Sequence, residues 1–544
     1  MRDGRLARWF GRPMRWLSFL AGGGVAILVF PAPSLSYVAW FGLLPGMVLF
    51  TRAPGTREAV WRGWWFGAGY LIAMLYWMAP EIGPGLVLLG GVAGCIYSPF
   101  AASVFKLLRP PPARPELSWR RCALALIVTP ACWVVPEWIR SYQGLGGPWD
   151  LYGASQWQHP AVLALAAIGG AWLVSVALVM ANVALFVLLT ALWLRRAALA
   201  ASAVAVFAVV AGAGPLAFAL TPPFPAVRPV TISLVQPGLT STPAAQSDAS
   251  EALTRSLSKP GSFGGKKPDL IVWGESSIDE DLTLPSSRPL LGRIEALSAQ
   301  TGAEILVSQD ATPPGKGHEK WAVLVNPAGI QGIYVKTRLV PFGEYIPFRQ
   351  ELGWLTSISK AAGSNMTPGT GAHLLHAVSR SGQPLPIGVL VCFESAFPDM
   401  SRVDADLGAQ VIVYQSSTVT FQGTWGPDQH ASLAALRAAE TGRPVVQAAL
   451  TGDSVAFDAR GRQLAWMGQS SDGVITVSLG LPAGSARTFY DEHGDYVMWS
   501  CVVIAALAAL VMLARRRGFL GGTTGAAGED AAQYETDTGQ PVAS

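Results

Sequence analysis

The chain has 544 residues, of which 51% are hydrophobic, only 14% are charged and 20 are tryptophan. Average soluble proteins carry about 25% charged residues, so this composition excludes an ordinary soluble protein and predicts a polytopic membrane protein with more than one domain. The net charge of +4 is small for this length and gives no indication of nucleic-acid binding.

Eight apolar stretches are long enough to cross a bilayer as helices, which takes about 20 mostly apolar residues. The first follows five arginines, as a signal peptide would, but no small-residue cleavage site follows it and the next stretch begins almost at once. We therefore interpret it as a retained span. The predicted spans cover residues 16–31, 34–51, 63–80, 84–106, 122–140, 160–192, 198–220 and 496–514.

Basic residues alternate along the loops between these spans. Arginines and lysines precede span 1 and follow spans 2, 4, 6 and 8, whereas the loops after spans 1 and 3 carry none and the loop after span 5 carries only Arg140. The positive-inside rule then places both termini in the cytoplasm. We expect a seven-span membrane domain over 1–220, an extracytoplasmic domain over 221–495, an eighth span over 496–517 and a disordered cytoplasmic tail over 518–544.

The sequence pattern of the predicted outside domain indicates an α/β fold. Short apolar runs such as "DLIVWGE", "GIYVK" and "IGVLVCFE" recur between turn signals. Several of these runs are continuous rather than alternating, which is typical of strands buried on both faces. Residues 288–302 show a helical apolar period and end at Gly302. The pattern predicts sheets covered by helices.

Three chemically reactive residues stand at the carboxyl ends of predicted strands, where α/β proteins tend to bind ligands. They are Glu275, Lys336 and Cys392. Taken singly, each has an ordinary explanation: a surface carboxylate at a helix start, a solvated edge charge and a buried core thiol. Taken together they form a chemical unit, because a carboxylate can remove the thiol proton and a lysine can offset the charge of an oxyanion.

The other cysteines do not extend this unit. Four of the five cysteines lie in or beside apolar runs, so Cys392 is the one thiol of the outside domain and has no disulfide partner there. The sequence contains no CxxC pair and no His/Cys cluster with metal-ligand spacing. We expect neither a metal nor another cofactor.

A glutamate after a strand, the run "KTRLVPFGEYIPF" and the run "VLVCFE" resemble the carbon–nitrogen hydrolase (nitrilase) superfamily. Together with the eight spans and the segment "PEWIRSYQGLGGPWDLYGASQWQHP", they resemble its membrane-embedded branch, the apolipoprotein N-acyltransferase family. The resemblance implies an αββα sandwich. It also implies that Cys392 is the nucleophile, Glu275 the general base and Lys336 the charge-stabilising residue, with Glu344 and Glu394 as supporting glutamates.

The resemblance further implies an activity. The family takes an acyl chain from a phospholipid as a cysteine thioester and passes it to the α-amino group of a diacylglyceryl-cysteine at an apolipoprotein N-terminus, the last step of bacterial lipoprotein maturation. We accordingly expect a monomer in the cytoplasmic membrane, with a phospholipid and an apolipoprotein as its partners.

Two other functions are compatible with parts of the sequence. A membrane-anchored amidase or nitrilase explains the three reactive residues but needs only one span. A non-enzymatic lipid transporter with an outside cap explains the spans but not the reactive residues. The segment from Pro341 to His376 also contains several aromatic residues, which we expect either to meet the bilayer surface or to pack on the domain core.

Overall fold

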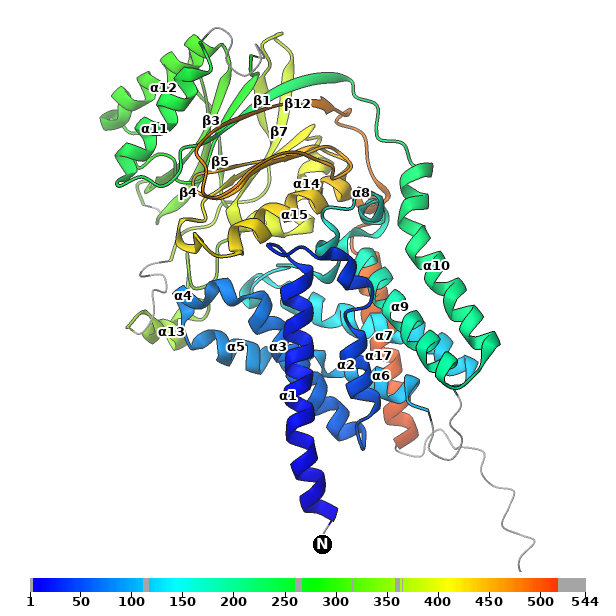
Figure 1. Ribbon diagram of the computed structural model, residues 1–544. Coiled ribbons are helices and arrows are strands. Elements are labelled where there is room, and N and C mark those ends of the chain that lie inside the picture. Colours follow the sequence, from blue (N-terminus) through cyan, green and yellow to red (C-terminus); the bar gives the residue numbers. More distant parts are fainter. Residues whose placement is uncertain are drawn as a thin grey trace, which may run out of the picture.

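The computed structural model describes residues 3–110, 117–259, 267–315, 317–357, 363 and 365–516. It consists of a helical part and an α/β part stacked on each other (Figure 1). The predicted tail over 518–544 lies outside the described residues.

The helical part is formed by the first half of the chain and the last helix. Helix α1 (Asp3–Val29) packs along α3 (Thr56–Met74), and α17 (Tyr496–Arg516) packs along α7 (Trp119–Arg140). The remaining helices are α2 (Leu44–Thr51), α4 (Ala79–Ile82), α5 (Gly85–Ala93), α6 (Ser98–Leu108), α8 (Pro160–Leu163), α9 (Ala166–Trp193) and α10 (Ala197–Leu220).

Among the residues that the structure describes, five helical stretches are long and apolar enough to cross a membrane. They coincide with predicted spans four to eight: Gly85–Leu108, Trp119–Arg140, Ala166–Trp193, Ala197–Leu220 and Tyr496–Arg515. The second predicted span contains a shorter apolar helical segment, Ser36–Thr51. The first and third lie on α1 and α3, where Arg15 and Arg62 both pair with Glu58. Charged residues lower the mean hydropathy of these helices, so the count of eight stays a prediction.

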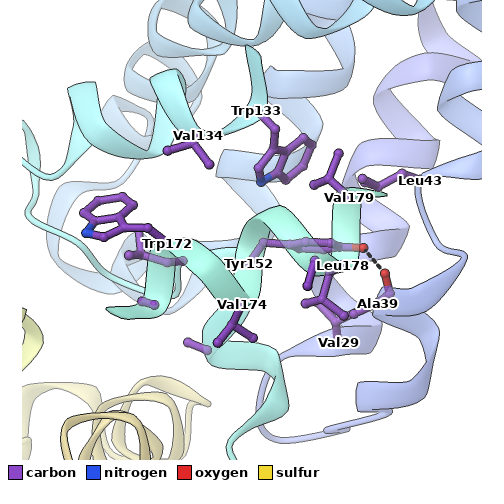
Figure 2. Close-up of a cluster of buried hydrophobic side chains, with 14 of the residues drawn as sticks. Val29, Ala39, Leu43, Trp133, Val134, Tyr152, Trp172, Val174, Leu178 and Val179 are labelled. Atoms are coloured by element: carbon purple, nitrogen blue, oxygen red, sulfur yellow. Dashed lines mark hydrogen bonds between the residues drawn. The ribbon is translucent and has the colours of Figure 1, made fainter. Parts of the chain in front are cut away.

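The loop between α7 and α8 folds back into the helical part instead of running over its surface. Its short 3-10 turn, η5 (Tyr152–Gln156), is buried, and the Tyr152 hydroxyl donates to the carbonyl of Ala39 at 2.8 Å. Figure 2 shows the Tyr152 ring among apolar side chains of the surrounding helices. The helices of the membrane part therefore hold one side of this loop in place.

The α/β part has two six-stranded sheets. In the first, the order is β12-β1-β2-β3-β4-β5, with β12 (Gly473–Leu481), β1 (Arg228–Gln236), β2 (Leu270–Trp273), β3 (Glu304–Ala311), β4 (Glu319–Asn326) and β5 (Gly329–Val335). In the second, the order is β11-β10-β9-β8-β7-β6, with β11 (Gln463–Met467), β10 (Ser454–Phe457), β9 (Val445–Ala449), β8 (Val411–Ser416), β7 (Pro384–Val391) and β6 (Leu375–Val378).

Alternating strand residues fill two layers of core, which explains the continuous apolar runs. In β7, Val389 and Val391 join the cluster between the two sheets, whereas Leu390 points to the other face. Helices α11 (Pro243–Ser256) and α12 (Arg288–Thr301) cover the first sheet, and α14 (Pro398–Leu407) and α15 (Gly426–Thr441) cover the second (Figure 1). The predicted αββα sandwich is confirmed.

Helices α14 and α15 also form the contact with the helical part (Figure 1). Leu433, Leu436 and Phe397 belong to the same buried cluster as Trp133 and Trp172 of the helices. The N-terminus and the end of α17 both lie at the far end of the helical part, away from the sheets (Figure 1). The first described helix thus begins, and the last one ends, on the same side, and which side is cytoplasmic stays a prediction.

Candidate active site

The three reactive residues come from three strands of two different sheets. Glu275 follows β2 and Lys336 follows β5 of the first sheet, while Cys392 follows β7 of the second. Cys392 has a φ of +52°, a left-handed conformation that residues with a side chain rarely adopt. This sharp turn after β7 directs the thiol toward the other sheet.

The structure brings all three side chains together. The Lys336 ammonium lies 3.3 Å from Glu275 Oε1, and the Cys392 thiol is close enough to the Glu275 carboxylate for each group to shift the pKa of the other. Lys336 is fully buried and Glu275 is almost so. The second Glu275 oxygen accepts from the backbone N–H of Ser417 at 3.0 Å, which fixes the carboxylate plane.

The two neighbouring lysines keep the Glu275 carboxylate charged despite its burial. Burial alone would raise its pKa, but Lys320 and Lys336 outweigh that effect and hold the pKa at about 2. Burial, reinforced by the neighbouring Glu275 charge, raises the pKa of Cys392 to about 12. Cys392 at rest is therefore a neutral thiol beside an ionised carboxylate. Were the thiol to attack a substrate, its proton would have to leave as the new bond forms.

The two predicted supporting glutamates occupy distinct places. Glu344 Oε1 lies 2.7 Å from Lys336 Nζ, and its Oε2 accepts from the backbone N–H of Val340. Glu394 is fully buried, and its hydrogen bonds do not include one to the Lys336 ammonium. It accepts from the backbone N–H groups of Thr337, Arg338 and Val391 and from the Tyr334 and Thr337 hydroxyls. Glu394 thus ties the lysine-bearing loop to the turn that carries Cys392.

The sequence interpretation missed a second lysine. Lys320 Nζ, on β4, lies 3.4 Å from Glu275 Oε1, 3.1 Å from Asp310 Oδ1 and 2.8 Å from Ser276 Oγ. Strand β4 pairs antiparallel with β5, and the backbone N–H of Lys336 donates to the Lys320 carbonyl at 2.8 Å. A hairpin register over "EKWAVLVNPAGIQGIYVK" would have placed the two lysines side by side.

The segment after Lys336 carries exposed aromatic side chains. Phe348 is 79% exposed and Trp354 is 59% exposed, and α13 (Arg349–Leu352) lies between them in sequence. In Figure 1, α13 lies at the height of α4 and α5 of the helical part. These two aromatics are not packed into the domain core, which favours the interfacial alternative over the core-packing one.

Two buried ionisable residues of α7, Glu137 and Arg140, contact the α7–α8 loop. Arg140 donates to the carbonyls of Trp149 and Asp150, and Glu137 accepts from Trp133 Nε1 and from the backbone N–H of Tyr152. Both residues thus hold the α7–α8 loop against the helices. Both side chains can bind the loop because its backbone turns carbonyl groups toward Arg140 and an N–H group toward Glu137.

Known proteins match both parts of the chain. Residues 22–184 match the model of the apolipoprotein N-acyltransferase N-terminal domain, and residues 265–486 match the carbon-nitrogen hydrolase model. A curated apolipoprotein N-acyltransferase from Allorhizobium ampelinum is 30% identical, with 93% of this chain and 96% of the relative covered. The chain belongs to the apolipoprotein N-acyltransferase family.

Other relatives agree with this family. The apolipoprotein N-acyltransferase of Chlorobaculum tepidum is 28% identical over 94% of this chain and 99% of its own length. Among solved structures, an amidase from Nesterenkonia sp. AN1 is similar at 19% identity and a TM-score of 0.32, covering 46% of this chain and 92% of its own. A carbon-nitrogen hydrolase from Helicobacter pylori G27 has 14% identity and a TM-score of 0.35, covering 54% and 99%. The two family models and the two curated relatives confirm the resemblance seen in the sequence, and with the apolar helices they show that the chain is a membrane protein of this family.

Proposed function

We propose that the protein transfers a fatty acyl chain from a phospholipid to the α-amino group of the diacylglyceryl-cysteine that begins an apolipoprotein. The chain would be held in between as a thioester on Cys392. The observation that carries this proposal is the buried contact of Cys392, Glu275 and Lys336, in a chain whose other half is a bundle of apolar helices. A covalent nucleophile fits transfer between two lipid substrates that bind in turn.

In the first half-reaction, Cys392 Sγ attacks the ester carbonyl of the phospholipid and Glu275 removes the thiol proton. The carbonyl oxygen becomes an oxyanion, whose charge Lys336 and Lys320 offset from within a buried site. When the intermediate collapses, the carbon–oxygen ester bond breaks and Glu275 returns the proton to the leaving lysophospholipid oxygen. The products are the acyl-cysteine and a lysophospholipid.

In the second half-reaction, the amine of the apolipoprotein attacks the thioester. Glu275 takes a proton from the attacking nitrogen, the carbon–sulfur bond breaks, and the proton passes to the departing sulfur. Cys392 is then restored as a thiol, the state favoured by its raised pKa of about 12. The amine must be unprotonated to attack, so we expect the second step to accelerate with rising pH until the amine is deprotonated.

The proposed placement follows from the same features. We propose that the α/β part lies outside the cytoplasmic membrane, that both termini are cytoplasmic and that the enzyme acts as a monomer. The exposed Phe348 and Trp354 support contact of the site's rim with the bilayer surface. A site at this surface lets both substrates keep their acyl chains in lipid.

The test uses purified full-length protein in phospholipid vesicles with a synthetic diacylated lipopeptide. We expect the lipopeptide to gain the mass of one acyl chain, and the protein given phospholipid alone to gain the same mass on the peptide containing Cys392. In Cys392→Ser both signals should fall by more than about 10³-fold. An intact protein that hydrolyses small amides but never acylates the lipopeptide would be an amidase, and the proposal would be wrong.

A further inference from the structure

His430 lies directly behind the nucleophile and has no place in the acyl-transfer steps above. It sits on α15 and is only 2% exposed. Its Nε2 lies 3.1 Å from the carbonyl oxygen of Cys392 and 2.8 Å from Ser395 Oγ, and its Nδ1 lies 3.1 Å from Ser416 Oγ. The imidazole therefore bridges the turn that carries the nucleophile and the end of strand β8.

The protonation state of His430 follows from its surroundings. Burial lowers its pKa to about 4, so the ring is neutral at physiological pH. A neutral imidazole has one donor and one acceptor nitrogen. Since the Cys392 carbonyl can only accept, Nε2 carries the hydrogen and Nδ1 accepts from the Ser416 hydroxyl. The carbonyl of Ser416 in turn accepts the backbone N–H of Glu275 at 3.2 Å.

The nucleophile needs such support. The left-handed backbone of Cys392 is disfavoured for a residue with a side chain and persists only where surrounding contacts hold it. Glu394 holds the turn from one side through the backbone N–H of Val391, and His430 holds it from the other through the Cys392 carbonyl. These two contacts set the direction of the Cys392 side chain toward Glu275.

One flat face of the His430 ring is covered by a residue from the helical part of the protein. Trp149, from the α7–α8 loop, stacks on the imidazole with ring centroids 5.5 Å apart and an interplanar angle of 3°. Trp149 donates from Nε1 to Gln429 at 3.1 Å and packs against Trp77 at 4.9 Å between centroids. Arg140 of α7 holds the Trp149 carbonyl. The position of the imidazole thus depends on membrane helices as well as on α15.

We infer that His430 is a positioning residue that holds the Cys392 thiol against Glu275, and that Trp149 locks its ring in place from the membrane part of the chain. The inference rests on the proposed function only in taking Cys392 as the nucleophile. It gives the helical part a second task besides anchoring: the reactive geometry is complete only when the α7–α8 loop is docked.

The experiment follows alkylation of Cys392 by iodoacetamide in the full-length, detergent-solubilised protein, resolved by peptide mass spectrometry. The new carbon–sulfur bond forms as iodide leaves and Glu275 takes the thiol proton. The charged groups that face the thiol are Glu275, Lys336 and Glu344, and they are the same in every variant. The parent rate should vary little between about pH 6 and 9, because the thiol stays protonated and the neighbouring Glu275 stays ionised over this range.

Two substitutions separate positioning from bulk structure. His430→Gln keeps a donor at the ε position facing the Cys392 carbonyl, whereas His430→Asn reaches only the δ position near Ser416. We expect the Asn variant to react about 100-fold more slowly at neutral pH, as for a reacting group displaced by about 1 Å. Its rate should rise steeply with pH, as for a thiol without a base. The Gln variant should recover the flat profile.

The controls make the outcome decisive. His493 is also stacked on an aromatic ring, Phe489, and hydrogen-bonded through Nδ1 to the Phe489 carbonyl, but it is exposed and its bonds do not reach Cys392 or Glu275, so His493→Asn should behave as the parent. Trp149→Leu removes the stacking without touching Cys392 and should shift the pH profile in the same direction as His430→Asn. Thermal unfolding checks that each variant is folded.

Equal rates and equal pH profiles for the Gln and Asn variants would overturn the inference, and so would a Trp149→Leu protein that reacts as the parent does. Alkylation requires no lipid substrate. A parent that alkylates as expected but never acylates the lipopeptide would therefore contradict the proposed function and leave the role of His430 standing.

Discussion

At the scale of single residues, the base is held charged by more than one cation. Lys336 and Lys320 both approach Glu275 Oε1, at 3.3 and 3.4 Å. Lys336 also contacts Glu344, while Lys320 also contacts Asp310 on the outer side. Each lysine also pairs with a second carboxylate, so the two positive charges beside Glu275 are both compensated. Together they keep Glu275 ionised despite its burial.

We predict that Lys320→Met raises the pKa of Glu275 from its value of about 2. A carboxyl group with a depressed folded-state pKa stabilises the fold above its unfolded pKa of about 4.3, and that stability is lost as the pH falls through the folded pKa. The variant should therefore lose Cys392 acylation and acid stability at a higher pH than the parent. The measurements are the acylation rate and thermal unfolding across an acidic pH series.

Lys267→Met is the control, since Lys267 is exposed in the same α/β part. If the acid limb of the rate profile lies at the same pH in the Lys320→Met protein, the parent and the control, then Lys320 does not hold the charge of Glu275.

At the scale of elements, a single buried carboxylate joins the ends of two strands in opposite sheets. Glu394 accepts from Thr337 and Arg338 just after β5, and from Val391 at the end of β7. Three of its partners are backbone N–H groups at these loop ends, so Glu394 satisfies them as a capping residue satisfies the N–H groups at a helix start. The spacing between Lys336 and Cys392 depends on this connection.

We predict that Glu394→Gln lowers both stability and activity. The amide NH₂ replaces an acceptor where the surrounding groups are donors, so at least one buried donor loses its partner, at a cost of about 1–3 kcal/mol. Thermal unfolding should show the loss, and the rate of acyl-enzyme formation should fall further than the stability alone explains. Glu295→Gln, which alters an ion pair with the exposed Arg288 on α12, should change neither by much.

At the scale of the whole molecule, the two parts share one core. The apolar faces of α14 and α15 are buried with tryptophans of the helices, and Phe421 of the α/β part packs on Trp77 at 4.7 Å. A free α/β part would expose this surface to water. Patches of this kind are rare on soluble monomers and promote association.

We therefore predict that residues 221–495 expressed alone are insoluble or aggregated without detergent, and that their Cys392 loses the flat alkylation profile of the full chain. Size-exclusion chromatography and the alkylation assay provide the readouts. A soluble, monodisperse fragment with the parent's profile would contradict both the shared core and the role of Trp149.

The amino-acid sequence by itself determined the class of protein, the α/β strands and the residues at their ends. Apolar runs and strand-end positions are properties of a local stretch, and local patterns report backbone conformation and burial directly. Glu275, Lys336 and Cys392 were found in this way, and family membership followed from the motifs around them.

Only the tertiary structure decided which residues complete the site. Lys320 reaches Glu275 through a hairpin register, and His430 meets Trp149 across 281 positions of the chain, from an unrelated loop. Contacts of this kind leave no periodic pattern in the sequence, because they form only when separate helices, strands and loops pack against one another. The span count is a different case: α1 and α3 pack among the other helices, but their ion-paired charged residues lower their mean hydropathy, and whether they cross the membrane stays a prediction. The contact of Trp149 with His430, which itself touches the Cys392 carbonyl, forms only when the helical part docks onto α15, and no local pattern encodes it.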